Sequence, residues 1–456
     1  MSGEILSRIR ISKSPSSVLA ALGACQAICY LYILELGKLN TRIIPCMAAF
    51  LGAFVLYCAF LAVLKNCIPA KQQTKRPGRK NYPVVLIAAF ALCFRIIMLF
   101  SPASLSDDVY RYVWEGKIFS AGYNPFAIAP EDPQLEPLRD AVIFPGVTRK
   151  NLTAIYPPVS QFIFAACAFI SPTILAMKIT FVIFDLATIA VLLLTLQALG
   201  MGLHRIAIYA LNPLVIMEFA GSGHLDSAGI FFLMLALYLF TRKKNLSPLI
   251  ALAAAFLVKL LPILFLPFIL RRKKLAGLLL FAALCLIACG PFLSAGNNLW
   301  QSLGIYAQHW YFNAPAHDLL MELCRDSLLA RKAAALIFCA ALSALYLQHF
   351  RKSSAADAAC IYRVCFLTLV IFYLLTATLH PWYVCWIVPF LVIVPGRALL
   401  LFSGTVFLSY WVLKEYAASG IWEEQPAIKI LEYVPCALLF FYDRIRAHSC
   451  RKEARP

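Results

Sequence analysis

Two adjacent carboxylates, Asp107 and Asp108, are the side chains best suited to chemistry, because they lie just beyond a long apolar run. A carboxylate at the edge of an apolar phase is costly to desolvate, and Arg111 and Tyr112 can partner it from one helical turn away. Ser106 is placed to cap a helix whose first turn holds both acids. This structural interpretation is compatible with catalysis, since a capped turn is a rigid mount for a general base.

Three further polar residues stand out in apolar surroundings. His224 and Asp226 follow a short apolar run in a glycine-rich break, which is also typical of a plain loop between helices. Lys259 lies inside another apolar run with no acidic residue nearby in the sequence. An intramembrane cation of this kind predicts an anionic ligand such as a lipid phosphate. The alternative is that Lys259 extends to the membrane surface.

The elements that position these residues follow from the composition. Of 456 residues, 62% are hydrophobic and only 14% are charged, whereas soluble proteins carry about 25% charged residues. Continuous apolar runs recur along the chain, many near the length of about 20 residues that a spanning helix needs, without the alternation of barrel strands. Soluble, disordered and disulfide-framework classes are excluded. We expect one all-α polytopic membrane domain over 1–456, with about twelve transmembrane helices plus short re-entrant or juxtamembrane helices.

The positions of Lys and Arg predict the orientation of the chain. Basic clusters occur at 65–80, 242–244 and 271–274 and in the C-terminal tail, and such clusters stay on the cytoplasmic side of a membrane. This bias accounts for most of the net charge of +19, so no nucleic acid partner is expected.

An even number of crossings must separate two segments on the same side of the membrane. Five apolar runs lie between the basic clusters near 80 and 242, so one of them is expected to be broken or re-entrant. The two candidates contain proline, at Pro157-Pro158 and at Asn212-Pro213. The run 247–270 is expected to form two short helices, or a re-entrant element, around Lys259. The polar pieces that this count leaves outside are the loop 103–153, the segment 220–227, the loop 295–330 and the turn His380-Pro381-Trp382-Tyr383.

Several ordered motifs resemble one known family. The first external loop resembles that of bacterial mannosyltransferase-like members of the GT-C glycosyltransferase superfamily, through Asp107-Asp108-x-x-Arg111-Tyr112-x-Trp114-Glu115-Gly116, Gly122-x-Asn124-Pro125-Phe126 and Ile155-Tyr156-Pro157-Pro158. Later blocks are similar as well: Asn212-Pro213-Leu214, Glu218-Phe219-Ala220-Gly221-Ser222-Gly223-His224-x-Asp226, Val258-Lys259 and His380-Pro381-Trp382-Tyr383. The resemblance covers residues 106 to about 390.

The resemblance implies an inverting membrane glycosyltransferase with its active site on the extracytoplasmic face of a bacterial inner membrane. Its donor would be a hexose, with mannose favoured, linked to a polyprenyl phosphate, and its acceptor a glycolipid or glycan. Either Asp107 or Asp108 would be the general base, with Asp107 favoured. The leaving phosphate would need positive charge rather than a second, acidic carboxyl. No cofactor or metal site is expected.

The remaining residues receive roles from the same resemblance. The residues expected to bind the donor phosphate are Arg111, Lys259, His224 and His380. Those expected to bind acceptor or sugar are Tyr112, Trp114, Glu115, Asn124, Tyr156, Asp226 and Trp382. The main alternative is a transporter of lipids or sugar-linked lipids, which would show two related halves with matching broken helices. A third possibility is a lectin-like or assembly subunit with inert carboxylates.

Overall fold

The computed structural model describes residues 15–67, 82–270, 274–352 and 358–453. The described residues are helical, without a strand, and one isolated bridge pairs Phe312 with Thr378. The first half of the chain forms α1 (Pro15–Glu35), α2 (Ile43–Cys67), α3 (Tyr82–Leu99), α4 (Asp108–Ser120), α5 (Ile143–Gly146), α6 (Pro158–Ile170), α7 (Ile174–Ala198), α8 (Ala207–Ala210), α9 (Pro213–Ile216) and α10 (Asp226–Thr241). The second half forms α11 (Ser247–Val258), α12 (Leu266–Ile269), α13 (Lys274–Cys289), α14 (Asn298–His309), α15 (Pro315–Cys324), α16 (Ser327–Lys352), α17 (Ala358–Leu375), α18 (Pro381–Val384), α19 (Val388–Leu391), α20 (Arg397–Thr405), α21 (Val412–Ser419) and α22 (Pro426–Glu453).

Among the described residues, six helical segments are long and apolar enough to cross a membrane, and a bent pair would make a seventh. The six are Pro15–Glu35, Ile43–Asn66, Ile174–Ala198, Leu275–Ala295, Ser327–His349 and Arg397–Ser419. The predicted all-α polytopic membrane class is therefore confirmed. The expectation of about twelve full crossings is not confirmed, because other apolar runs form helices of 10–17 residues.

Proline and polar residues divide the runs that were expected to be irregular. The side chain of Asn212 accepts hydrogen bonds from the N–H groups of Leu214 and Val215, and Pro213 has no N–H to continue the preceding helix. The pair Leu203–Ala210 and Pro213–Ser222 is bent there by 57°, which confirms the broken helix predicted in this region.

The run 247–270 divides as predicted around Lys259. Helix α11 ends at Val258, and Lys259 adopts an extended backbone with φ of −152°. A 3-10 segment, η6 (Leu261–Phe265), and the one-turn helix α12 follow. Lys259 therefore lies at a helix break, where its side chain can leave the helix surface. The basic segments 68–81 and 271–273, expected on the cytoplasmic side, lie outside the described residues.

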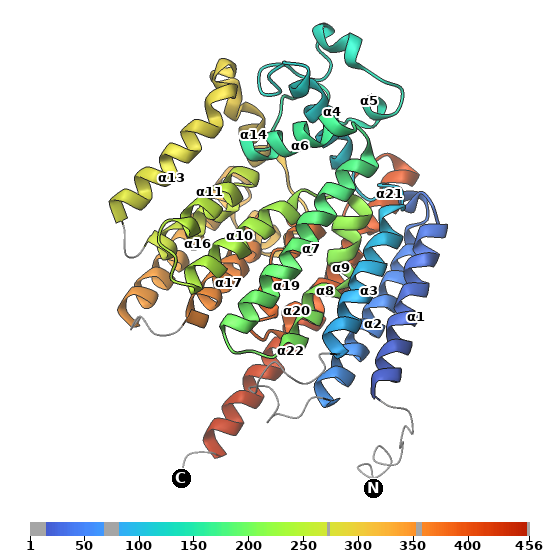
Figure 1. Ribbon diagram of the computed structural model, residues 1–456, viewed down its shortest axis with the longest axis vertical. Helices are drawn as coiled ribbons and strands as arrows, with labels where there is room; N and C mark the ends of the chain where they lie inside the picture. The colour runs from blue at the N-terminus through green and yellow to red at the C-terminus, as the bar shows by residue number, and fades with distance from the viewer. Residues whose placement is uncertain (1–14, 68–81, 271–273, 353–357, 454–456) are drawn as a thin grey trace.

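Figure 1 shows how the helices gather the polar loops at one end of the molecule. Helices α4, α5, α6 and α14 lie at the end opposite to the start of α1 and the end of α22 (Figure 1). Helices α1, α2 and α3 pack together on one flank, and α10 packs between α7 and α11. The loop 103–153, which carries α4 and α5, and the start of the loop 295–330, which carries α14, thus share one end of the helical body.

Buried charged side chains join helix α3 to helix α7. Arg95 of α3 and Asp185 of α7 are fully buried, and Arg95 Nε lies 2.6 Å from Asp185 Oδ2. Tyr209 also donates to Asp185 Oδ1 at 2.8 Å. Lys178 donates to the carbonyl groups of Met98, Leu99 and Ser101 at the end of α3. These contacts fasten α3 to α7 directly below the loop that carries Asp108.

Candidate active site

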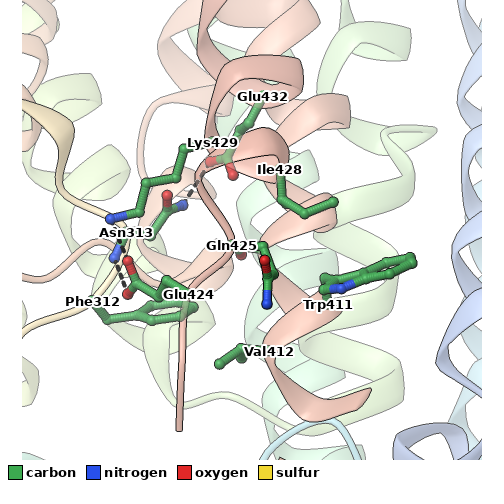
Figure 2. Close-up of a pocket in the computed structure, with 10 residues that line it drawn as sticks. Phe312, Asn313, Trp411, Val412, Glu424, Gln425, Ile428, Lys429 and Glu432 are labelled. Carbon is green, nitrogen blue, oxygen red and sulfur yellow. Dashed lines mark hydrogen bonds and ion pairs between the residues drawn. The ribbon is translucent and has the colours of Figure 1, made fainter. Parts of the chain in front are cut away.

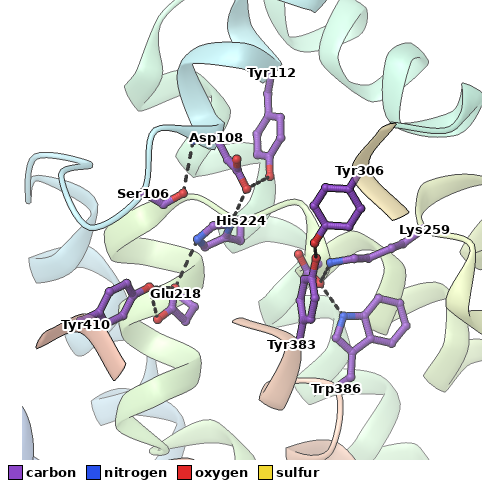
Figure 3. Close-up of polar contacts among 11 residues, drawn as sticks. Ser106, Asp108, Tyr112, Glu218, His224, Lys259, Tyr306, Tyr383, Trp386 and Tyr410 are labelled. Carbon is purple, nitrogen blue, oxygen red and sulfur yellow. Dashed lines mark hydrogen bonds and ion pairs between the residues drawn. The ribbon is translucent and has the colours of Figure 1, made fainter. Parts of the chain in front are cut away.

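The two adjacent carboxylates begin helix α4 but differ in exposure. Asp107 occupies the N-cap position without a side-chain capping bond and is exposed, while Asp108 is the first helical residue. The Ser106 hydroxyl accepts a hydrogen bond from the Asp108 N–H at 3.3 Å, and a helix begins here as predicted. The predicted cap is one residue off, because the N-cap is Asp107 rather than Ser106 and only Asp108 lies in the first turn. Tyr112, one turn further on, donates to Asp108 Oδ2 at 3.4 Å. Figure 3 shows Asp108 directed toward Tyr112 and His224.

The surroundings of Asp108 bring the pKa of its carboxyl group close to neutral pH. Burial among protein atoms raises the pKa of Asp108 to about 7, and the negative charge of Asp107 adds to this effect. The positive charge of Lys259 acts in the opposite direction. A base whose pKa lies near the working pH is well placed to exchange a proton in catalysis.

A π-helical turn and one glycine carry His224 toward Asp108. The π-helix η5 (Met217–Ser222) ends at Gly223, whose φ of 76° is left-handed. A Cβ atom on Gly223 would lie 2.9 Å from Cγ of Lys178, so both the backbone conformation and the space favour glycine here. Beyond it, the His224 N–H bonds to the carbonyl of Glu218 at 3.0 Å. The turn therefore folds His224 back over Glu218.

The imidazole of His224 is fully buried between two carboxyl groups. Its Nδ1 lies 3.7 Å from Asp108 Oδ2, and its Nε2 lies 3.3 Å from Glu218 Oε2. The Tyr410 hydroxyl donates to Glu218 and lies 2.9 Å from its Oε1 and 3.1 Å from its Oε2. Burial and the positive charge of Lys259 lower the pKa of His224 well below its usual range, so the ring is neutral at pH 7. Figure 3 shows this row of Asp108, His224, Glu218 and Tyr410.

Aromatic rings fix the plane of that imidazole. Trp382 stacks on His224 with ring centroids 4.1 Å apart, and His380 stacks on Trp382 at 4.3 Å. Phe312, from the loop between α14 and α15, stacks in turn on His380 at 4.8 Å. Burial lowers the pKa of His380 to about 3, so this ring is neutral too. The predicted turn at residues 380–383 therefore packs directly on the site.

Lys259 reaches the site from the helix break after α11. Its Nζ lies 2.6 Å from Asp226 Oδ1, and Trp386 Nε1 donates to the same oxygen at 2.6 Å. The Nζ atom also lies 4.0 Å from the centroid of the Tyr383 ring. The Lys259 side chain is 26% exposed, whereas that of Asp226 is 1% exposed. Lys259 is thus held in the site by groups that are distant in the sequence.

Tyr156 borders the site, while other residues expected there hold the surrounding loop together. The Tyr156 ring contacts the Tyr112 ring edge to face, at 4.9 Å between centroids. Arg111, expected to partner the acidic pair, instead binds Glu115 at 2.6 Å and the carbonyl of Leu152. Three other residues that were expected to bind acceptor or sugar contact protein groups instead. Glu115 accepts a hydrogen bond from Gln161, Asn124 donates one to Ser294, and the Trp114 ring packs on the Phe144 ring.

The loop 295–330 closes over the site and is anchored on α22. Asn313 Nδ2 donates to Glu432 Oε1 at 2.6 Å, and Lys429 bridges Asp318 and Glu424. Figure 2 shows a pocket that is lined by Asn313, Glu424, Lys429 and Glu432 and by Phe312. The anchor fixes Phe312 where it stacks on His380.

Sequence reasoning left several site residues without a role. Glu218 and Tyr383 lie inside motifs that were recognised, so their proximity to assigned residues was a usable signal. Trp386 follows Trp382 by one helical turn. Tyr306 donates to or accepts from the Tyr383 hydroxyl at 2.7 Å. Tyr410 carries no motif and contacts Glu218 across 192 positions of sequence, so no signal pointed to it.

The fold and site define the class of protein: a helical membrane protein with a buried row of acid–base groups at one end of its helices. A family model described as alpha-(1->6)-mannopyranosyltransferase, N-terminal domain, matches residues 19–272, which is more than half of the chain. The chain belongs to this family and is a membrane mannosyltransferase. No curated protein and no solved structure matches it. Within the described ranges, no group of three or more His, Cys, Asp or Glu side chains is arranged to hold a metal ion.

Proposed function

We propose that the protein transfers a mannosyl residue from a polyprenyl-phosphate donor to a hydroxyl group of a glycolipid or glycan, with inversion. The observation that carries the proposal is the placement of Asp108 within electrostatic range of Lys259, at the end of the molecule where the polar loops gather. These two groups supply what the reaction requires: a base for the acceptor and a cation for the leaving phosphate.

The proposed reaction is a single displacement. The acceptor oxygen attacks the anomeric carbon of the donor from the face opposite to the phosphate, and Asp108 takes the proton of the acceptor hydroxyl. A new C–O bond forms as the bond between the anomeric carbon and the phosphate oxygen breaks. The electron pair of that bond leaves on the phosphate, which is already a stable anion and needs no acid.

We assign the base to Asp108 rather than to Asp107, which the resemblance favoured. Asp108 is the residue directed toward Tyr112 and His224, and its pKa is raised to about 7. Asp107 is exposed at the N-cap. Its negative charge still acts on Asp108, so Asp107 tunes the base without being the base.

We assign the donor phosphate to Lys259 among the four candidates. Lys259 keeps part of its side chain exposed, and an ammonium group has three donors, of which Asp226 uses one. Arg111 is occupied by Glu115, and His224 and His380 lie within a stack of rings. Asp226, Tyr383 and Trp386 then hold Lys259 in place.

The proposed location is a bacterial inner membrane, with the site on the extracytoplasmic face. The support is the distribution of basic clusters, which predicts that the loop 103–153 faces outward. A lipid-linked donor fits a site mounted on membrane helices. The transporter alternative loses support because the chain belongs to a mannosyltransferase family.

The donor is tested with purified protein in lipid nanodiscs. Radiolabelled mannose is supplied either on a polyprenyl phosphate or on a nucleotide, together with a mannan oligosaccharide acceptor. We expect labelled product only with the lipid-linked donor, and we expect the new linkage to have the opposite anomeric configuration from the donor. Equal transfer from the nucleotide sugar, without a lipid intermediate, would contradict the proposed donor.

A further inference from the structure

The imidazole of His224 has unfilled hydrogen-bonding capacity at a buried position. Neither of its ring nitrogens completes a hydrogen bond with the described residues, although each faces a carboxyl group at 3.3 or 3.7 Å. Buried polar atoms are rarely left without a partner unless they serve a function. Catalytic hydrogen bonds are often long in unliganded structures and tighten when substrate binds. A small shift of the Asp108 side chain toward His224 would bring the two groups within hydrogen-bonding distance.

The chemistry of a neutral imidazole determines in which direction hydrogen bonds are donated along Glu218, His224 and Asp108. Such a ring has one N–H donor and one lone pair, so only one of the two flanking carboxyl groups can receive its hydrogen. The other group must bring its own proton, since a carboxylate facing a lone pair is repelled. Glu218 has no exposed surface, whereas Asp108 is 30% exposed and feels the positive charge of Lys259. Glu218 is therefore the protonated partner and Asp108 the ionised one.

We propose that Tyr410, Glu218 and His224 form a directional hydrogen-bonded relay that positions and stabilises the ionised form of Asp108. In this relay Tyr410 donates to Glu218 Oε1, the protonated Oε2 of Glu218 donates to Nε2 of His224, and Nδ1–H donates to Asp108 Oδ2. The second oxygen of Asp108 stays free for the acceptor hydroxyl. None of the three touches substrate, so they are positioning residues, and the inference rests on the proposed function of Asp108.

The packing around the relay favours this role. Trp382 and His380 lie nearly parallel to the imidazole or to each other, with interplanar angles of 17° and 4°, and so hold its plane toward both carboxyl groups. The charged or titratable groups that face Asp108, besides His224, are Asp107, Lys259, Asp226, Glu218, Tyr112, Tyr156, Tyr306, Tyr383 and Tyr410. Those that face His224 are Asp108, Glu218, Lys259 and His380. Those that face Glu218, besides His224, are Asp226, Asp108, Tyr410, Cys46 and Cys385. Lys259 and Asp226 compensate each other, and Tyr112 donates to Asp108 Oδ2, the same oxygen that the relay would reach.

Two substitutions of Glu218 distinguish a role in hydrogen bonding from a role in packing. Glu218→Gln keeps an N–H donor toward His224 Nε2, so we expect kcat within about threefold of wild type. Glu218→Met keeps the length of the side chain but has no donor, so we expect kcat to fall by about 10- to 100-fold. We expect the KM for the lipid-linked donor to stay unchanged, because the donor contacts Lys259. We also expect the acid limb of the kcat–pH profile to move to higher pH, because the ionised form of Asp108 loses support.

The controls address folding and the underlying function separately. Tyr410→Phe removes only the hydroxyl group at the end of the relay and should shift the acid limb in the same direction by a smaller amount. If Glu218→Met unfolds, as judged by thermal melting in nanodiscs, Tyr410→Phe and Glu218→Gln still give the comparison. The relay is overturned if Gln is as damaging as Met, or if no variant moves the acid limb. Asp108→Asn is measured in parallel: if it retains activity, the base assignment fails, whatever the relay variants show.

Discussion

The Nζ atom of Lys259 and the Oδ1 atom of Asp226 lie 2.6 Å apart, joining the break after α11 to the first turn of α10. The Lys259 side chain is 26% exposed and that of Asp226 only 1%. The pair therefore presents a cation to the site while it buries the counter-ion. This arrangement suits a lysine that binds a phosphate when the donor is present and stays paired with Asp226 when it is not.

Replacement of Lys259 should impair use of the donor more than folding of the protein. We expect Lys259→Met to lower transfer by about 10- to 100-fold, through loss of positive charge at the leaving phosphate. Because the single variant leaves a buried carboxylate unpaired, the matched variant is Lys259→Met with Asp226→Asn. Steady-state transfer in nanodiscs provides the measurement. Recovery of activity in the double variant would show that Lys259 serves only to neutralise Asp226.

The activity should fall as pH drops through the pKa of the base. Asp108 acts when it is ionised, and its pKa is raised to about 7, so the rate is expected to rise with pH, to reach half its maximum near pH 7 and to level off above that pH. Asp107→Asn removes a like charge, which favours ionisation of Asp108 and should move the midpoint to lower pH. Glu136→Gln removes an exposed charge from the same loop and serves as the control. Equal midpoints for Asp107→Asn and Glu136→Gln would contradict this account.

The buried pair of Arg95 and Asp185 should matter for stability rather than for chemistry. Arg95→Met leaves the carboxylate of Asp185 buried without its ion partner, which is expected to cost about 3–5 kcal/mol of unfolding free energy. Arg95→Met combined with Asp185→Leu should recover most of that loss, because no charge remains buried. Thermal unfolding in detergent compares the two variants. A double variant no more stable than the single one would show that the loss does not come from the unpaired charge of Asp185.

The left-handed turn at Gly223 should be sensitive to a single methyl group. Gly223→Ala combines a φ of 76° with a Cβ placed 2.9 Å from Lys178 Cγ, so it should displace His224 and reduce transfer by at least about tenfold. Gly420→Ala is the matched control, because Gly420 has a φ of 71° but nothing within 4 Å of its Cβ position. Transfer rates and melting temperatures are compared for both variants. Similar losses in the two would attribute the effect to backbone strain alone.

Much of the fold followed from the sequence because the membrane imposes simple rules on apolar runs and basic clusters. The break at Asn212-Pro213 was one of two candidates predicted from proline, and the division at Lys259 was predicted from the basic clusters on either side of it. The parity of crossings predicted that the His224 segment lies on the same face as Asp108, and in the structure His224 Nδ1 lies 3.7 Å from Asp108 Oδ2. The number of full crossings did not follow, since an apolar run reveals hydropathy but not where a short helix stops.

The site was less accessible to sequence reasoning, for a geometric reason. Arg111 lies one helical turn from the acidic pair and also one turn from Glu115, and spacing alone does not decide between the two partners. The tertiary contacts of Tyr410 with Glu218 and of Trp386 with Asp226 join segments that are 192 and 160 positions apart. Such contacts depend on helix packing, which a single sequence does not specify.

The central claim is that Asp108 is the base, and one comparison tests it most directly. Mannosyl transfer from a polyprenyl-phosphate donor is measured at pH 8 for wild type, Asp107→Asn and Asp108→Asn in the same nanodiscs, with thermal melting to confirm folding. The account predicts that Asp108→Asn lowers kcat by about 10²- to 10⁴-fold, while Asp107→Asn stays within about tenfold of wild type. Transfer retained by a folded Asp108→Asn protein, or abolished by Asp107→Asn instead, would contradict it.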